Sequence, residues 1–573
     1  MNCQALNTQA LHLGFYADVL DSRLALWEKV SLPRRLWQRD GTLWVADPRQ
    51  AAATPELADR LGWLTLPSSM IAETENLAAF AAEIKAAGFT HVVLLGMGGS
   101  SLAPEVLMTI FGNAAGYPVL QVLDSTHPDA VGALAAGLDI PRTLFLVSSK
   151  SGGTIETLSL FNYFFSLAES VLENPGNHFV AITDPGSKLE TLALAKQFRR
   201  IFSSPQEVGG RYSALTFFGL LPAALIGINV GALLNQTGIM AAACGPGVPA
   251  ADNPALVLGA ALGELALAGR DKVVFLTTPK LASFGVWVEQ LVAESTGKRG
   301  RGILPVVGEP LADAESYGPD CCFVALQLVG DHQESLAADL DALRQAGLPL
   351  ISIEVQESIS LAQEFYRWEM ATAAAGAVLE VNPFDQPNVE AAKSKAREVM
   401  AACKTTGSLP IRPPLVQDEY LTVYGLDAAV QPGSVGAVLA TFLSRVQPGD
   451  YLALMAYLPM FPKNDALLQQ LRLLLRRRCQ VETTLGYGPR FLHSTGQLHK
   501  GDGNRGVFLQ LTADGDCDIM IPGQLYTFGV LIAAQAQGDY QALEENGRRL
   551  LRIHLSGSPI AGLKQLLALL AAG

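Results

Sequence analysis

Apolar segments that alternate with Gly/Ser loops and helix-like stretches are the feature that most constrains the fold of this chain. The segment "HVVLLG" at 91–96 runs into the loop "GMGGSSLAPE", and "TLFLVSS" at 143–149 runs into "KSGGTIET". The plan starts again with "KVVFLTT" at 272–278. Apolar strands that alternate with helices are typical of a parallel sheet with both faces covered. We therefore predict an α/β fold of three-layer αβα units.

The chain length indicates more than one domain. A chain of 573 residues is long for a single domain and suggests two or three. Segments rich in Pro, Gly and Ala at 243–255, and a Pro-containing segment at 404–416, indicate boundaries. We expect helices in residues 1–70. The predicted division is 1–250 (N-terminal helices and a first domain), 251–405 (a second domain) and 406–573 (a C-terminal α/β segment).

The composition excludes several classes of protein. The formal net charge is −13 and no basic run is present, which argues against a nucleic-acid partner. The seven cysteines show no CxxC pair and no disulfide-framework spacing, which favours reduced thiols in a cytoplasmic protein. The N-terminus lacks a basic stretch before an apolar core, so we expect no signal peptide.

One uncharged segment, 215–234, is long enough to span a bilayer. Glycine, proline and asparagine residues interrupt it, and no second segment of this kind accompanies it. We therefore predict a buried core helix here and no membrane partner.

The two Gly/Ser loops indicate an anion site. At a strand–helix junction, free backbone N–H groups and the helix dipole favour a bound anion. Glycines let the backbone approach closely, and the hydroxyls of Ser149, Ser151 and Thr154 can each donate to a phosphate oxygen. Neither loop has the spacing of a Walker loop or of the dinucleotide fingerprint. A tight turn with Ser or Thr N-caps explains either loop alone, whereas two such loops favour a phosphorylated small molecule.

Six motifs together resemble those of the glucose-6-phosphate isomerase family, whose fold is the sugar-isomerase (SIS) fold. They are the two loops, "VGGRYS" (208–213), "VEQLVAESTGK" (288–298), "NPFDQPNVE" (382–390) and "HSTGQLHKG" (493–501). The pattern covers most of residues 20–560 and is most similar to the isomerase part of bifunctional transaldolase/phosphoglucose isomerase proteins. The resemblance implies two SIS-type doubly wound domains before the C-terminal segment. The chain carries no additional length for a transaldolase barrel.

The resemblance also implies roles for individual residues. It makes Glu294 the base that moves a proton between C2 and C1, and Arg211 the cation that stabilises the enediolate. It makes His493, with Lys393, the group that opens the sugar ring, since an imidazole titrates near neutral pH. The implied substrate-binding residues are Gly99, Ser100, Ser149, Lys150, Ser151, Thr154, Gln290 and Gln386.

The motif at 493–501 departs from the family pattern. It follows the "FDQ" segment, which it precedes in the common enzyme, and one residue is missing between His493 and His499. Two histidines at this spacing also suggest metal ligands, but no Cys or Glu pattern accompanies them. We expect neither a metal nor another cofactor.

The resemblance implies reversible conversion of glucose 6-phosphate to fructose 6-phosphate through ring opening and a cis-enediol, a step of glycolysis and gluconeogenesis. A dual phosphoglucose/phosphomannose isomerase and a non-catalytic SIS protein that senses a sugar phosphate are the alternatives. A separate transaldolase partner, a homodimer and a monomer all stay open.

Overall fold

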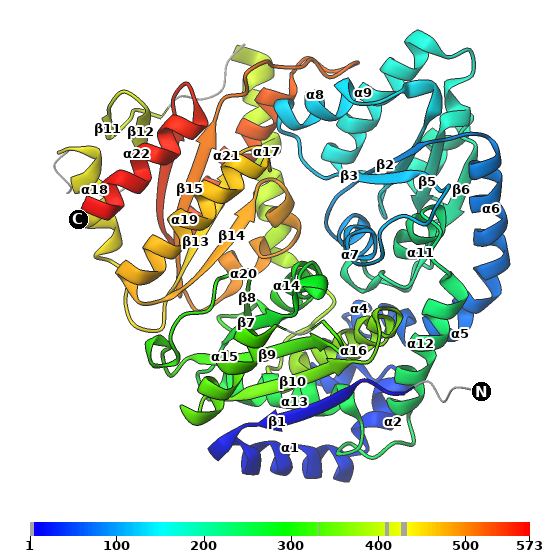
Figure 1. Ribbon diagram of the computed structural model, residues 1–573, viewed down its shortest axis with the longest axis vertical. Helices are drawn as coiled ribbons and strands as arrows, with labels where there is room; N and C mark the ends of the chain where they lie inside the picture. The colour runs from blue at the N-terminus through cyan, green and yellow to red at the C-terminus, as the bar shows by residue number, and fades with distance from the viewer. Residues whose placement is uncertain (1–4, 332, 407–411, 426–432, 573) are drawn as a thin grey trace.

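The computed structural model describes residues 5–331, 333–406, 412–425 and 433–572. It contains three β-sheets of five, five and six strands. Figure 1 shows them around a centre at which helices α14 (Phe284–Thr296) and α20 (Gly496–Gly501) lie. The predicted α/β fold with parallel sheets is therefore confirmed.

The first sheet is entirely parallel and carries both Gly/Ser loops. Its strands, in spatial order, are β3 (Val119–Leu123), β2 (His91–Gly96), β4 (Thr143–Ser148), β5 (Phe179–Thr183) and β6 (Arg200–Ser203). Alternate residues of β2 and β4 belong to two different hydrophobic cores, one on each face of the sheet. One core includes α6 (Thr74–Ala86), α7 (Leu102–Phe111) and α11 (Phe217–Leu225). The other includes α8 (Pro128–Ala136), α9 (Ile155–Val171) and α10 (Lys188–Ala195). Burial on both faces explains why these strands read as continuous apolar runs.

The second sheet combines four parallel strands with one antiparallel edge strand. Its order is β1 (Thr8–His12), β10 (Leu350–Val355), β9 (Cys321–Leu328), β7 (Lys272–Thr277) and β8 (Leu304–Val307). Its helices are α13 (Pro254–Leu267), α14, α15 (Glu334–Gln345) and α16 (Ala362–Val378).

The third sheet belongs to the C-terminal part of the chain. Its order is β11 (Val416–Gln417), β12 (Leu421–Tyr424), β16 (Arg549–Leu555), β15 (Gly506–Ala513), β13 (Tyr451–Tyr457) and β14 (Glu482–Tyr487). One face packs on α18 (Val435–Leu443), α19 (Pro462–Cys479) and α22 (Pro559–Ala572). The opposite face shares a core with α21 (Phe528–Glu545) and with the second sheet. This shared core brings the C-terminal part against the rest of the molecule.

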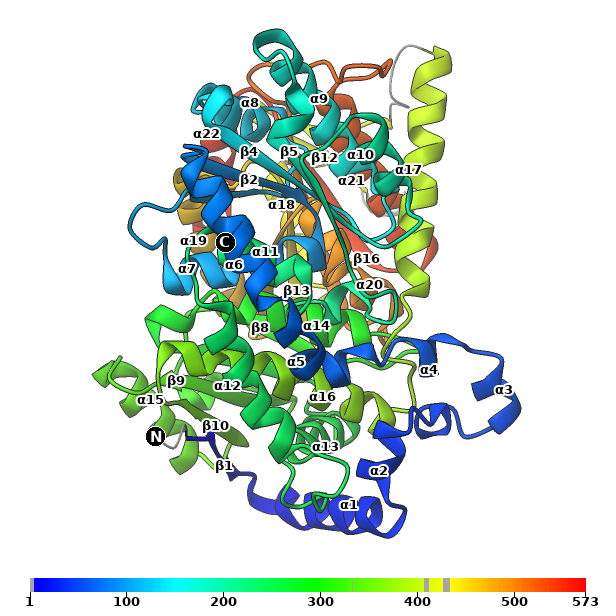
Figure 2. The ribbon, with the colours of Figure 1, turned by 90° about the vertical axis from the view of Figure 1, so that its right-hand side faces the viewer.

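The helix α17 (Pro387–Thr406) connects the second sheet to the third and packs along α21. Figure 2 shows it as a long helix standing at one side of the molecule.

Two expectations about the chain are corrected. Residues 1–70 are not purely helical, because β1 precedes the helices and pairs with β10. The helices there are α1 (Ala17–Lys29), α2 (Leu32–Trp37), α3 (Pro48–Ala52), α4 (Glu56–Asp59) and α5 (Leu66–Ser69). The segment 215–234 is mostly buried but forms two helices rather than one, because Gly227 has a φ of +86° and Asn229, which is exposed, caps α12 (Val230–Ala243). Among the described helices, none has the length and apolar character that crossing a bilayer requires. The domain limits at 250 and 405 stay a prediction.

Candidate active site

The two Gly/Ser loops lie side by side at the carboxyl ends of β2 and β4. Gly96 and Ser148, the last residues of these strands, are paired in register. The Ser148 hydroxyl donates to the carbonyl oxygen of Ser100 at 3.2 Å. Because the two strand ends are paired, the two predicted substrate loops lie next to each other at the same edge of the sheet.

The second loop surrounds the start of α9. The Ser149 hydroxyl donates to that of Thr154 at 3.2 Å, and the Ser151 hydroxyl accepts from the N–H of Gly153 at 3.3 Å. Thr154 occupies the N-cap position of α9, yet its side chain makes no capping hydrogen bond there. The Lys150 ammonium turns away to Asp184, with Nζ–Oδ distances of 2.8 and 2.6 Å. Only the backbone of Lys150 is therefore available to an anion in the loop.

The first loop is a point of very close approach between three segments. Gly98 has a φ of +54°, and a Cβ atom there would lie 2.8 Å from the Gln290 amide nitrogen and 2.9 Å from the His493 Cβ. A Cβ atom on Gly99 would overlap the carbonyl oxygen of Gly210. Only glycine allows three segments to meet here: helix α14 with Gln290, the turn that carries His493 and the turn that carries Arg211.

Arg211 is buried and fully engaged. Its Nε donates to Ser295 Oγ at 2.8 Å, and one terminal nitrogen donates to the carbonyl oxygens of Pro383 and Asp385 at 2.8 and 2.7 Å. The other terminal nitrogen contacts Gln386 Oε1 at 3.1 Å and Glu294 Oε1 at 3.2 Å. Three motifs that are distant in the sequence therefore meet at one guanidinium group.

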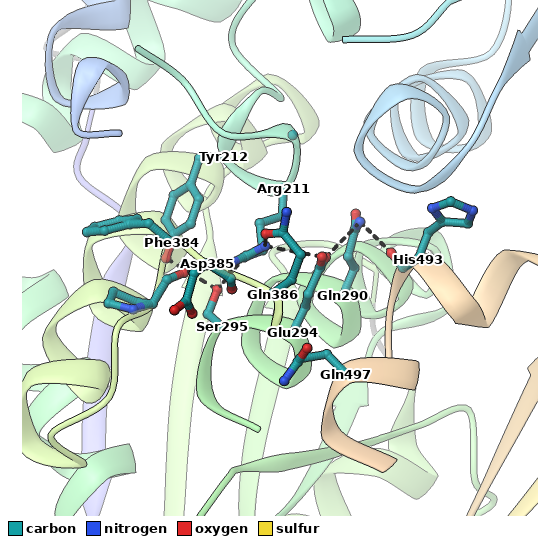
Figure 3. Close-up of polar contacts among 12 residues, drawn as sticks. Arg211, Tyr212, Gln290, Glu294, Ser295, Phe384, Asp385, Gln386, His493 and Gln497 are labelled. Atoms are coloured by element: carbon teal, nitrogen blue, oxygen red, sulfur yellow. Dashed lines mark hydrogen bonds and ion pairs between the residues drawn. The ribbon is translucent and has the colours of Figure 1, made fainter. Parts of the chain in front are cut away.

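Glu294 lies between that guanidinium and Gln290. Its side chain is about one-tenth exposed, and its Oε2 atom accepts from the Gln290 amide at 3.3 Å. The same amide donates to the His493 carbonyl oxygen at 2.6 Å. Figure 3 shows Gln290 between Glu294 and the histidine turn. The carboxylate is thus held in a fixed place by two polar neighbours, as a proton-transferring base requires.

His493 is held by a carboxylate of the first sheet's helix layer. It ends the 3-10 turn Arg490–His493, which follows β14. Its Nε2 atom lies 3.1 Å from Oε1 of Glu156, in the first turn of α9. That oxygen also accepts from Gln535 of α21 at 2.7 Å. Burial alone would raise the pKa of Glu156, but the charge and hydrogen bond of His493, then a backbone hydrogen bond, and last the charge of Lys393 outweigh it and lower that pKa. The positive charge of Lys393 on α17 therefore reaches Glu156.

Arg490 fastens the histidine turn to the first sheet. Its guanidinium pairs with Glu105 of α7 and lies 3.4 Å from Asp124, which follows β3. The Ser101 hydroxyl donates to the same Asp124 carboxylate at 3.0 Å. The turn that carries His493 is thus bound to the first loop through charged groups.

Lys298 is a site residue that the sequence reasoning left without a role. It is buried, and its ammonium donates to the carbonyl oxygens of Asn382 and Asp385, the latter at 2.6 Å. It also lies 2.8 Å from the Asp385 carboxylate. Burial and then the charge of Arg211 lower the pKa of Lys298 to about 7. Together with Arg211, this residue holds the segment that presents Gln386.

The second histidine of the motif is a core residue. His499 is buried against Tyr451, Phe491 and Phe508, and its ring nitrogens have no hydrogen-bond partner among the described residues. Burial lowers the pKa of His499 well below its usual value. In the same motif, Gln497 accepts from the N–H of Asn388 at 2.9 Å and donates to its side chain at 2.7 Å. This part of the motif therefore packs the third sheet's unit against the "FDQ" segment.

The structure thus brings most of the twelve predicted residues to one place. Linked contacts join Gly99, Arg211, Gln290, Glu294, Gln386 and His493. Ser149, Ser151 and Thr154 lie directly before the turn of α9 that carries Glu156, and Ser100 is tied to Ser148. Lys393 takes part through its charge, and the Lys150 side chain points elsewhere. Glu156, Gln535 and Arg490 were missed, because each acts through a partner distant in the sequence.

The fold and the site define a class of protein. The two predicted phosphate loops lie at the carboxyl ends of parallel strands, beside a buried carboxylate, a buried guanidinium and a histidine paired with a second carboxylate. These are the functional groups that an enzyme needs to move a proton within a phosphorylated sugar.

Comparisons with known proteins give the particular family. Residues 76–302 match the family described as "Phosphoglucose isomerase". A glucose-6-phosphate isomerase of Parabacteroides distasonis is 31% identical over 388 residues, which are 58% of this chain and 86% of the relative. A probable glucose-6-phosphate isomerase of Methanococcus maripaludis is 27% identical over 55% of this chain and 80% of its own. The chain belongs to the glucose-6-phosphate isomerase family.

Solved structures agree in fold. A hypothetical protein from Thermus thermophilus matches with a TM-score of 0.57 and 26% identity, over 69% of this chain and 100% of that one. A glucose-6-phosphate isomerase from Chlamydia trachomatis matches with a TM-score of 0.57 over 70% of this chain and 89% of that one. At 18% identity, the latter shows the fold alone. The particular similarity to bifunctional transaldolase/phosphoglucose isomerase proteins stays a prediction.

Proposed function

We propose that this protein interconverts glucose 6-phosphate and fructose 6-phosphate. The observation that carries the proposal is the contact of Glu294 with both Arg211 and Gln290, because it places a single buried carboxylate beside a fixed positive charge. Family membership supports the same reaction.

The phosphate is held first. The hydroxyls of Ser149, Ser151 and Thr154 and the backbone of Lys150 bind its oxygens at the start of α9, where the helix dipole favours negative charge. Gly99, Ser100 and Gln386 line the space for the sugar carbons. Binding at this end directs the carbon chain towards Glu294.

Ring opening follows. His493, with its partner Glu156 and the charge of Lys393, transfers the proton of the O1 hydroxyl to the ring oxygen O5 as the C1–O5 bond breaks. The product is the open-chain aldehyde, with C1 doubly bonded to oxygen.

Proton transfer then completes the isomerisation. Glu294 removes the proton from C2, the electron pair forms the C1–C2 double bond, and O1 gains a negative charge that Arg211 stabilises. Glu294 returns the proton to C1, and the proton of the O2 hydroxyl passes to O1, so that C2 becomes the ketone and C1 carries a hydroxyl. The reaction needs no oxidant and no reductant.

We further propose that one chain supplies the whole site. The contacts of His493 with Glu156 and of Gln290 with His493 are made within the same chain. A cytoplasmic location is part of the same proposal, supported by the free thiols of Cys244, Cys321, Cys322, Cys479 and Cys517.

The test is a coupled assay of the purified protein with glucose 6-phosphate deuterated at C2. We expect fructose 6-phosphate to form, with deuterium either moved to C1 or lost to water. Tight binding of fructose 6-phosphate without interconversion would contradict the proposal and favour a sugar-phosphate sensor. Parallel assays with mannose 6-phosphate separate a strict isomerase from one with dual specificity.

A further inference from the structure

A cavity of about 630 Å³ lies in the third sheet's unit, outside the isomerase site. It opens at the carboxyl ends of the parallel strands β13, β15 and β16, where Tyr457, Thr512 and His554 line it. Its lining residues include none of the twelve candidate active-site residues. Its volume is in the range of pockets for small organic ligands, about 300–1,000 Å³.

The position of this cavity in the sheet is one at which α/β proteins bind ligands. From β13, the chain goes first to β14 on one side and then to β15 on the other side. The strand order therefore reverses between β13 and β15. Open α/β sheets bind their ligands beyond the carboxyl ends of the strands at such a reversal.

Arg552 gives the cavity a positive charge, and Asp514 and Asp518 also line it. Its side chain is half-buried, with Nε donating to Gln510 Oε1 at 2.6 Å and one terminal nitrogen donating to the carbonyl oxygen of Ala536 at 2.9 Å. Within the described part of the chain, no carboxylate lies within ion-pair distance of it, although the charges of Asp539 and Glu544 act on it from further away. Arg412, at the same cavity, is instead neutralised by Glu544 through two contacts of 2.7 Å. A partly buried charge without a carboxylate in direct contact is costly, and a bound anion would relieve that cost.

Other polar groups of the cavity are suited to the same anion. The Nδ1 atom of His554 lies 3.1 Å from the Thr512 hydroxyl, and its Nε2 atom is 3.6 Å from Asp514, which is exposed. These groups can donate hydrogen bonds beside Arg552.

The remaining wall is aromatic and aliphatic. The guanidinium groups of Arg412 and Arg552 each lie 4.7 Å from the ring centre of Tyr540. Tyr424, Ile532 and Ala533 complete this part of the lining. Such a surface favours a flat, apolar body over a bare inorganic ion.

We propose that this cavity is a second ligand site, which binds a small organic anion with a planar ring. The anionic group contacts Arg552 and His554, and the ring packs against Tyr424, Tyr540 and Ile532. The site adjoins the isomerase centre through α21, because Gln535 on another face of that helix donates to Glu156. Because the cavity shares no lining residue with the twelve candidate residues, the ligand and the sugar phosphate can bind at the same time.

The test measures binding of phenyl phosphate and of benzoate to the full chain by calorimetry, in saturating fructose 6-phosphate. Inorganic phosphate tests the anion alone, and benzyl alcohol tests the ring alone. Arg552→Gln removes the charge, whereas Arg477→Gln, on the exposed surface of α19, is the matched control. Ala533→Phe fills the cavity without changing any charge. Circular dichroism melting establishes that each variant is folded.

We expect at least one of the two ring-bearing anions to bind, and both partial probes to bind at least tenfold more weakly. Arg552→Gln and Ala533→Phe should each weaken binding about tenfold or more, and Arg477→Gln should leave it unchanged. Equal binding by all four proteins would overturn the proposal, and so would displacement of the probe by fructose 6-phosphate. Inorganic phosphate binding as tightly as phenyl phosphate would exclude a site for an organic anion. None of these outcomes depends on isomerase turnover, so the two proposals fail separately.

Discussion

The imidazole Nε2 atom of His493 lies 3.1 Å from a carboxylate oxygen of Glu156, although 337 residues separate the two in the chain. Glu156 belongs to the layer of helices on the first sheet, and His493 follows a strand of the third sheet. Gln535 of α21 donates to the same oxygen. The third sheet's unit therefore supplies His493 and also, through Gln535, holds its partner Glu156. This explains how the histidine motif reaches the isomerase centre although it stands at a different place in the chain than in the common enzyme.

Glu156→Gln should weaken catalysis through His493. The substitution keeps the size of the side chain but removes the negative charge beside the imidazole. We expect kcat/KM for glucose 6-phosphate to fall about tenfold, in the range of one hydrogen bond to a charged group. Steady-state assays give the value, and Glu169→Gln, at the exposed end of the same helix, is the control. Unchanged kinetics in Glu156→Gln would show that the pair does not serve ring opening.

Glu294→Gln should abolish most turnover while leaving substrate binding intact. A glutamine can still contact Arg211 and Gln290, but it cannot accept a proton from C2. General base catalysis contributes about 10²–10⁴-fold, so we expect kcat to fall by about 10³-fold. Assays of kcat and calorimetric binding of fructose 6-phosphate measure the two effects. The control is Glu334→Gln, on the exposed start of α15. Near-normal turnover would remove Glu294 from the role of base.

A mixture of two inactive variants tests whether one chain supplies the whole site. Since His493 and Glu294 contact Gln290 of the same chain, Glu294→Gln mixed with His493→Gln should show no more activity than either alone. Gel filtration of the mixture reports whether the chains associate. Recovery of a substantial fraction of wild-type activity would mean that two chains exchange the histidine, contrary to our proposal.

Gly99→Ala should displace the Arg211 turn. The added methyl group would overlap the carbonyl oxygen of Gly210, so the backbone next to Arg211 has to move. A small shift of an aligned group costs much of its catalytic effect, and we expect kcat to fall about 10²-fold. The matched change is Gly238→Ala on α12, where a Cβ atom meets nothing within 4 Å. If both variants keep wild-type kcat, the close approach at Gly99 is not needed for catalysis.

The strands were predictable because their burial is uniform. Residues of β2 and β4 are buried on both faces, so each reads as an apolar run without the help of a partner. The strand β1 is different, because its five residues are only partly buried and depend on pairing with β10, some 340 residues away. The local sequence pattern alone therefore favoured a helical N-terminus. The strand forms because residues 8–12 pair with β10.

The residues of the site likewise differ in how well the sequence predicted them. Arg211 and Glu294 stand in compact motifs whose resemblance to a family assigned their roles. Glu156 carries no local signal, because its function comes from His493 in another part of the chain. Lys298 does have a signal, since it closes the "ESTGK" motif, but its role is to hold the carbonyl oxygens of a distant segment. Sequence patterns thus indicate reacting groups more readily than the groups that position them.

Lys298 should make the stability of the protein depend on pH. Burial and then the charge of Arg211 lower its pKa from 10.5 to about 7 in the folded protein. Between pH 7 and about 10.5, the unfolded chain therefore binds more protons at this residue than the folded chain does. Folding stability contributed by Lys298 consequently rises with pH across this window, and below pH 7 its unfavourable contribution is constant and at its largest.

The comparison with Lys298→Met isolates this contribution, because methionine fills similar space and does not titrate. We expect the melting temperature of the wild-type protein, relative to that of Lys298→Met, to increase steadily from pH 7 to pH 9.5. The scale is about 1.4 kcal/mol for each pH unit over which the lysine is charged only in the unfolded chain. Lys280→Met removes an exposed lysine and should show a difference that does not change with pH. A difference for Lys298→Met that is likewise constant would mean that this lysine keeps its proton in the folded protein throughout the range, held by the acceptors of Asn382 and Asp385.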